Sequence, residues 1–141
     1  KDNINLQTIS QYFSNQEEIQ DIDLQYQQLF EYWAGKTEEF YPSDEKILLD
    51  LIDIQTGYKI SVPARTNACD HFQVVEAEIL LKLHLCPICG KSFEPEQLII
   101  DKFVFELINY FEKTKNKVKT VEISLSTAAI KIMDYQYDEE S

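Results

Sequence analysis

The sequence predicts an α+β fold, in which helices and strands occupy separate stretches of the chain. Apolar residues recur at three- and four-residue steps over residues 15–34 and 101–111, which is typical of amphipathic helices. Residues 46–54 and 121–133 instead have the apolar, β-prone pattern of strands. Between these stretches, cysteine and histidine form two close pairs, and this arrangement predicts a metal-bound module within one domain-sized chain of 141 residues.

The first predicted element is a helix over residues 15–34. Ser14 lies three residues before Glu17, which is the spacing of a capping box at a helix start, and Gly35 is suited to end the helix. Its apolar stripe favours packing on the core, with binding to a partner protein as the alternative. The stripe consists of Ile19, Ile22, Tyr26, Leu29, Phe30 and Trp33.

A β-hairpin is predicted to lead into the metal-binding region. Residues 46–54 form its first strand, residues 55–57 supply the turn, and residues 58–62 return as its second strand. Pro63 ends the second strand because it cannot donate to a sheet ladder. Residues 74–75 predict a short strand, and residues 76–84 have the spacing of a short helix.

The last third of the chain predicts a helix followed by strands. Asp101 is a good N-cap for the helix, and residues 121–133 form one or two strands before an acidic end at residues 134–141. The apolar face of the helix consists of Phe103, Val104, Leu107, Ile108 and Phe111.

The charge of the chain limits its partners. It has 13 lysines and arginines against 25 acidic residues, and its formal net charge is −12. This balance argues against direct nucleic-acid binding, which depends on basic residues, and is explained either by attraction of basic partners or by solubility alone. No apolar run is long enough to span a membrane. The chain begins with Lys rather than Met and shows no secretory signal, so we expect a piece of a longer protein.

Two pairs of ligand-type residues predict one structural zinc site. Cys69 and His71 form a C-x-H pair, and Cys86 and Cys89 form a C-x-x-C pair. Together they provide the four donors of a tetrahedral zinc, which leaves no open position for a substrate. The alternatives are that His84 replaces one ligand, that the C-x-x-C pair is a redox site, or that the cysteines are simply buried. Metal-binding cysteines are typical of the cytosol or nucleus.

The residues around the ligands resemble the SP-RING (MIZ-type) zinc finger of the PIAS and Siz SUMO ligases. The resemblance covers about residues 45–112, and more loosely the strands to about residue 133. Four patterns appear in the family's order: I-x-x-P-x-R at residues 60–65, C-x-H at 69–71, C-P-x-C at 86–89 and L-x-x-D at 98–101.

The resemblance implies a small RING-like module with a single zinc. It comprises a β-hairpin, a short helix, zinc loops and a C-terminal helix. We therefore expect residues 1–44 to be a helical extension with a connector, 45–112 the zinc domain, and 113–141 a β segment with an acidic tail. The hydrogen bonds that replace a second metal would come from Ser61, Thr66, Asn67 and Lys91.

The resemblance also implies a SUMO ligase module. Such a module docks a SUMO-charged conjugating enzyme and promotes transfer to target lysines, and none of its own residues attacks the thioester. The module promotes transfer by orienting the flexible SUMO-charged conjugating enzyme, which is the donor. By position, the docking surface would consist of Val62, Pro63, Leu85, Pro87 and Ile88, for which ordinary packing beside the metal is the alternative.

One departure from the family pattern keeps a second function open. His84 and Leu85 stand where the family usually carries Trp, after a shorter loop than usual. The alternative is a zinc-stabilised interaction subunit of a larger complex without ligase activity, whose helix binds a partner through Phe30 and Trp33. Whether the chain is an enzyme therefore stays open.

A possible SUMO-interacting segment lies near the end of the chain. Ile130 and Ile132 belong to a short β-prone run that is followed by acids, as in motifs that add a strand to SUMO. The alternative is a last strand of this domain. Together these features predict SUMO and a SUMO-conjugating enzyme as partners, and a nuclear or cytosolic location.

Overall fold

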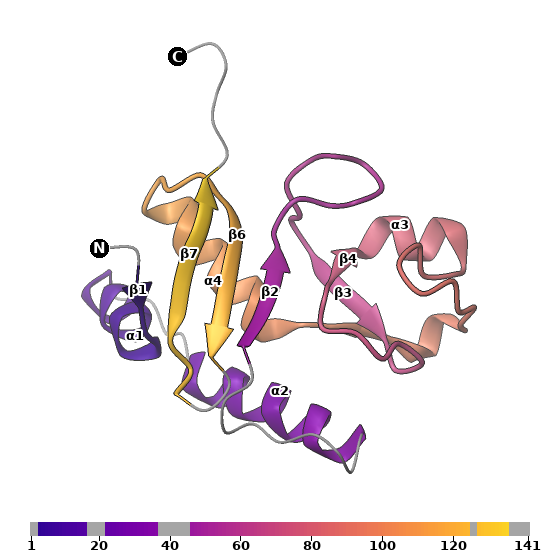
Figure 1. The fold of residues 1–141 in the computed structure, drawn as a ribbon, viewed down its shortest axis with the longest axis horizontal. Coiled ribbons are helices and arrows are strands. Elements are labelled where there is room, and N and C mark those ends of the chain that lie inside the picture. The colour runs from indigo at the N-terminus through magenta and orange to yellow at the C-terminus, as the bar shows by residue number, and fades with distance from the viewer. Residues whose placement is uncertain (1–2, 17–21, 37–45, 125–126, 136–141) are drawn as a thin grey trace.

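The computed structural model describes residues 3–16, 22–36, 46–124 and 127–135, and these form two antiparallel sheets with helices around them (Figure 1). The predicted α+β class is confirmed. A four-stranded sheet has the order β1-β7-β6-β2, and a three-stranded sheet has the order β4-β3-β5. None of the helices within these ranges is long and apolar enough to cross a membrane.

The strands of the larger sheet come from distant parts of the chain. They are β1 (Asn3–Ile4), β2 (Lys46–Asp50), β6 (Val118–Ser124) and β7 (Ile130–Tyr135). The smaller sheet consists of β3 (Pro63–Thr66), β4 (Val75–Glu76) and β5 (Leu98–Ile100). The helices are α1 (Leu6–Asn15), α2 (Ile22–Lys36), α3 (Ala77–Leu83) and α4 (Lys102–Lys113), with a short 3₁₀ helix η1 (Pro95–Gln97).

The larger hydrophobic core lies between the four-stranded sheet and α4, which runs behind the sheet in Figure 1. Every residue predicted for the apolar face of α4 is buried. Ile9 and Phe13 of α1 and Ile22 of α2 are also fully buried in this core. The predicted three-part division of the chain stays a prediction, and this core draws residues from all three parts.

A smaller core surrounds the cysteines and histidine predicted to bind metal. It is made by Ala64, Cys69, Val75, Ala77, Leu80, Cys86 and Phe93. The short helix α3 contributes two of these residues, because apolar side chains three positions apart lie on one helix face. The three-stranded sheet and α3 therefore form a separate packing unit beside the larger core.

The predicted N-terminal helix is wrong in its bounds. Residues 22–36 are helical as expected, but Asn5 starts an earlier helix, because its side chain accepts a hydrogen bond from the backbone N–H of Thr8 at 2.8 Å. Ser14 lies in the last turn of α1 and does not begin a helix, and Gly35 lies within α2. Glu17, the other half of the predicted capping box, lies outside the described residues.

The predicted hairpin is present but shorter than expected. β2 pairs with β6 along its whole length, and the hairpin that follows is closed by an antiparallel bridge between Ile52 and Lys59 and by two backbone hydrogen bonds, from the Asp53 N–H to the Tyr58 carbonyl and from the Ile60 N–H to the Leu51 carbonyl. Pro63 begins β3 and does not end a strand. The pairing with β6 extends over a whole strand and buries Leu49, whereas the two arms of the hairpin pair only over residues 51–53 and 58–60.

The helix and the strands predicted for the last third of the chain are confirmed, whereas β7 runs on into the predicted acidic end, of which residues 136–141 lie outside the described residues. Asp101 caps α4 by accepting from the Val104 N–H at 3.0 Å, and two strands, β6 and β7, follow the helix. Ile130 and Ile132 are buried in β7, which pairs with β6 on one side and, at Ile130, with β1 on the other. A SUMO-interacting role for these two residues would need β7 to leave the sheet.

Candidate metal centre

Four side chains converge where two loops of the smaller core meet. Cys69 and His71 lie in the loop after β3, and Cys86 and Cys89 lie in the loop after α3. Their ligand atoms all lie within 4.8 Å of one another. His84 does not belong to this group; it is exposed and ends α3 with a left-handed backbone.

The spacing of these atoms fits one zinc ion. The Sγ atoms of Cys69 and Cys89 are 3.8 Å apart, and Cys86 Sγ lies 3.4 Å from His71 Nε2. Zinc–sulfur bonds of about 2.3 Å and zinc–nitrogen bonds of about 2.0 Å give tetrahedron edges of about 3.8 and 3.6 Å. The chain therefore has one structural zinc site, filled by four protein ligands and closed to substrate.

Gln73 orients the histidine ligand and ties the zinc loop to the larger sheet. His71 Nδ1 donates to the Gln73 carbonyl at 2.8 Å, which leaves Nε2 for the metal. The Gln73 side chain then accepts from the Asp50 N–H and donates to the Asp50 carbonyl, both at 2.8 Å. In this way the metal loop is fastened to the end of β2.

The second ligand pair is held by a tight turn. The Gly90 N–H donates to the Cys86 carbonyl at 2.7 Å, with the glycine at a φ of 75°, a conformation that most side chains disfavour. The Lys91 ammonium donates to Asp70 at 2.8 Å and to the Ala68 carbonyl at 3.1 Å. Lys91 thus links the two ligand loops across the metal.

The thiols of the metal-free site differ in acidity. Burial raises the pKa of Cys69, but hydrogen bonds from His71 and Thr66 outweigh burial and lower this pKa to about 6. Burial, together with the negative charge on Cys69, raises the pKa of Cys86 to about 11. At neutral pH one of these two sulfurs is therefore a thiolate and the other is a thiol.

Zinc binding to the metal-free chain is expected to release protons and to weaken as the pH falls. The Cys86 thiol must lose its proton to bind zinc at any pH below about 11, and Cys69 must also lose one below about 6. Calorimetry in two buffers of different ionisation enthalpy measures the release. An affinity that is the same at both ends of the neutral range would contradict this expectation.

All four residues predicted to make hydrogen bonds in place of a second metal do make them. The sequence prediction missed two carboxylates that each accept several hydrogen bonds. Buried Asp53 accepts from the backbone N–H groups of Gln55, Thr56 and Glu76 at 2.8–3.0 Å, and so ties the 53–57 turn to β4. Glu76 in turn accepts from the Ser61 and Val62 N–H groups. The turn itself was predicted at residues 55–57, but Asp53 was assigned to the preceding strand and its role was therefore missed.

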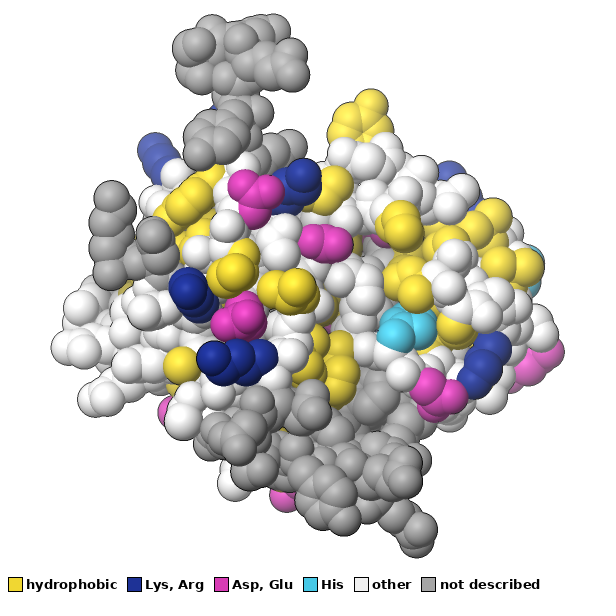
Figure 2. Space-filling model, viewed as in Figure 1, with side chains coloured by type: hydrophobic (Ala, Val, Ile, Leu, Met, Phe, Trp, Pro, Cys, Tyr) yellow, Lys and Arg dark blue, Asp and Glu magenta, His cyan; other side chains and the backbone are white. Residues whose placement is uncertain are grey.

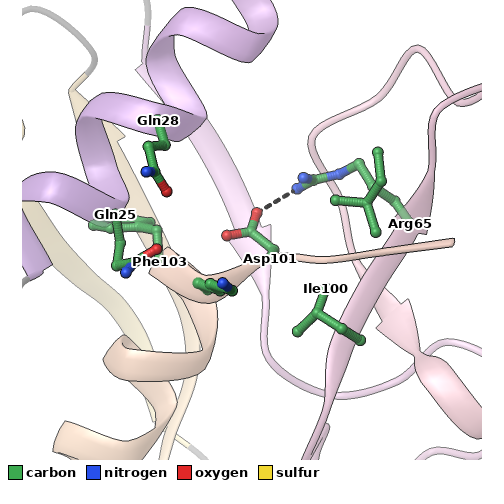
Figure 3. A pocket seen from close by; sticks show the side chains of 8 residues that line it. Gln25, Gln28, Arg65, Ile100, Asp101 and Phe103 are labelled. Carbon is green, nitrogen blue, oxygen red and sulfur yellow. Dashed lines mark ion pairs between the residues drawn. The ribbon is translucent and has the colours of Figure 1, made fainter.

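The outer motifs of the resemblance meet in a buried ion pair. Arg65 Nη2 lies 2.8 Å from Asp101 Oδ2, and both side chains are almost completely buried (Figure 3). Arg65 also donates to the Phe72 carbonyl in the zinc loop. The pair therefore joins β3, the metal loop and the start of α4, beside a pocket into which Gln25 and Gln28 of α2 point.

An apolar groove borders the zinc loops, and we call it the metal-side groove. Ile88 lines it together with Ile52 and Ile54, and Ile54 is 70% exposed. Figure 2 shows hydrophobic side chains gathered over this half of the molecule. The full lining is Asp50, Ile52, Asp53, Ile54, Gln73, Ile88, Lys119, Thr120 and Asp134.

The other residues predicted for docking are distributed differently. Leu85 is exposed and Pro87 is half-buried, both beside the zinc ligand Cys86. Pro63 is buried in β3, so its side chain is not available to a partner. Val62 lines a separate groove with Phe105 of α4. The sequence prediction missed Ile54 because it placed this residue in a strand.

Comparisons with known proteins agree with this picture. No model of a known protein family matches the chain. The E3 SUMO-protein ligase PIAS2 is 30% identical over 57 residues, which cover 36% of this chain and 10% of the Rattus norvegicus protein or 9% of the Homo sapiens protein. The human zinc finger MIZ domain-containing protein 1 is 26% identical over 83 residues, or 55% of this chain and 8% of that protein.

Two crystal structures of S. cerevisiae SUMO E3 ligases have a similar fold. SIZ2 matches 82% of this chain with a TM-score of 0.59 and 22% identity, and SIZ1 matches 77% with a TM-score of 0.59 and 20% identity. The matches cover 48% and 39% of those chains. The present chain thus spans less than half of either structure and about a tenth of the curated relatives.

Proposed function

We propose that this chain, which carries an SP-RING (MIZ-type) zinc domain, is the module of a SUMO ligase that docks a SUMO-charged conjugating enzyme and promotes transfer to target lysines. Relatives with this domain are named as SUMO ligases. A nuclear location and partnership with SUMO and its conjugating enzyme are part of the proposal.

The observation that carries the proposal is the metal-side groove. Two loops form its apolar wall: the 53–57 turn, which presents Ile54, and the zinc loop, which presents Ile88 with Pro87 and Leu85 beside it. Both loops are held rigidly, one by the Asp53 carboxylate and the other by the metal and the Gly90 turn. A rigid apolar surface suits docking of a protein partner, because little conformational freedom is lost on binding.

The mechanism that follows is positional. The closed zinc site holds the loops and offers no position for a reacting group. The chain's own contribution would be to fix the conjugating enzyme, and with it the thioester-linked donor, in an orientation suited to attack by a lysine. Ideal positioning is worth up to about 7–11 kcal/mol of an activation barrier, and restricting a tethered donor contributes part of that.

The second candidate is a zinc-stabilised interaction subunit without ligase activity. It is favoured by the residues before Cys86, where Leu85 is 40% exposed and His84 ends α3, and by the groove lining, in which none of the described residues is aromatic. Phe30, predicted to bind a partner, packs against Tyr26, which packs on Phe103 of α4. The Trp33 side chain lies outside the described residues.

A reconstituted SUMO transfer assay tests the proposal. The wild-type chain should stimulate transfer above the rate of the conjugating enzyme alone, and Ile54→Ala and Ile88→Ala should each reduce this stimulation roughly tenfold, the effect of losing a buried anchor at an interface. The zinc content of both variants should be unchanged, because neither residue is a ligand.

Leu48→Ala is the matched control. Leu48 is a similarly exposed aliphatic residue on β2, and it does not line the metal-side groove. Its removal should leave transfer unchanged. Wild-type chain that binds the conjugating enzyme without stimulating transfer would instead support the interaction subunit.

A further inference from the structure

We propose that the four-stranded sheet supplies an acidic rim to the metal-side groove, which selects a partner face that presents lysine or arginine beside its apolar contact. This inference rests on the proposed function, because it concerns the same groove. It adds the chemical character of the partner's surface, and it assigns a binding role to residues of the four-stranded sheet.

The rim is built by strand pairing. Asp50 of β2 lies opposite Thr120 of β6, which lies opposite Asp134 of β7. The three residues therefore form one row across the sheet. All three line the metal-side groove. Adjacent strands are about 4.8 Å apart, so the backbones of Asp50 and Asp134 are about 10 Å apart.

The carboxylates of this row are available to a partner. Both acids are exposed, and Thr120 Oγ1 donates to Asp50 Oδ1 at 2.9 Å, which orients that carboxylate without neutralising it. No ion pair involves either acid within the described part of the chain. Lys119 is the one cation among the lining residues, and its positive charge counteracts the two carboxylates.

Apolar wall and acidic rim together define the partner. The isoleucine wall and the acidic rim line the same groove, so a protein docked on the isoleucines would bring its charges close to the carboxylates, whose field extends about 8 Å at physiological salt. A basic face is also drawn by the net charge of −12, which accelerates encounter with a cationic partner. A neutral or acidic face would gain only the apolar contact.

The test measures the affinity of the full chain for a SUMO-conjugating enzyme from about 50 to about 300 mM salt. The double variant Asp50→Asn/Asp134→Asn keeps the side-chain shapes and should raise the Kd roughly threefold at low salt while flattening the salt dependence. Lys119→Gln should have the opposite effect and lower the Kd. The double variant Asp23→Asn/Glu31→Gln removes the same two charges from exposed residues of α2 and should change neither quantity.

The outcomes separate this inference from the proposed function. If Ile54→Ala abolishes binding while the rim double variant keeps the wild-type Kd and salt dependence, the groove docks the enzyme but the acidic rim has no role. This inference is then overturned, and the proposed function stands. If the wild-type chain does not bind the enzyme at all, the proposed function fails and the inference fails with it. Equal effects of the α2 double variant and the rim double variant would show that net charge acts without a rim.

Discussion

Removing zinc from this chain is expected to unfold its metal-binding half while the larger core stays folded. The smaller core contains the ligands Cys69 and Cys86, whereas the larger core contains none of the four ligands. Structural zinc contributes on the order of 10 kcal/mol or more of apparent folding free energy, which a core this small cannot replace. Hydrogen exchange before and after chelation measures the effect along the chain.

The two cores should respond differently in that experiment. Backbone amides of β3, α3 and residues 86–93 should lose protection, and those of β6, β7 and most of α4 should keep it. The two histidines provide a matched pair of variants. His71→Asn should abolish zinc binding, whereas His84→Asn should preserve it, since asparagine tolerates the left-handed backbone at the end of α3. Loss of zinc from the His84 variant would contradict the ligand set.

Removing Arg65 is expected to be the most destabilising change outside the metal ligands. Arg65→Met keeps much of the buried volume but leaves the Asp101 carboxylate buried without its ion-pair partner. Breaking a buried pair in this way costs about 3–5 kcal/mol of unfolding free energy, because the remaining charge is uncompensated. Asp101 also caps α4, so the damage should reach the start of that helix.

The exposed pair between Lys59 and Glu112 is the control. It also links the zinc module to α4, at 2.7 Å, but both of its side chains are partly exposed. Lys59→Met should therefore cost about 1 kcal/mol or less. Urea unfolding of the zinc-loaded variants measures the loss of unfolding free energy for each pair. Equal losses would refute the prediction that the buried pair contributes more to stability. Asp101→Asn combined with Arg65→Met should recover part of the stability, since no charge is then left buried.

The sequence predicted the metal centre well because its signals are local. Cys69 and His71 are two positions apart, as an inward-pointing ligand pair requires, and the cysteine knuckle is completed by Gly90 next to it in the chain. The N-cap of α4 and its buried face were predictable for the same reason. Each of these features depends on residues within one or two turns of one another.

Other features depended on partners far away in the chain. The strand over residues 46–50 pairs with β6, some 70 residues later, and not with the next β-prone segment. Arg65 and Asp101 belong to two recognised motifs, yet nothing in either motif indicates that they face each other. The first helix, α1, was not predicted, because it and its cap, Asn5, lie before the apolar stripe of residues 19–33.

The zinc ligands are therefore a property of the amino-acid sequence, because four soft donors at these short spacings have few other uses in so small a core. The surface around them is a property of the tertiary structure. Only folding brings Ile54 from the 53–57 turn beside Ile88, and places Asp50 and Asp134 in one row at their edge. Burial and strand register, which are set by the whole chain, decide which side chains a partner meets.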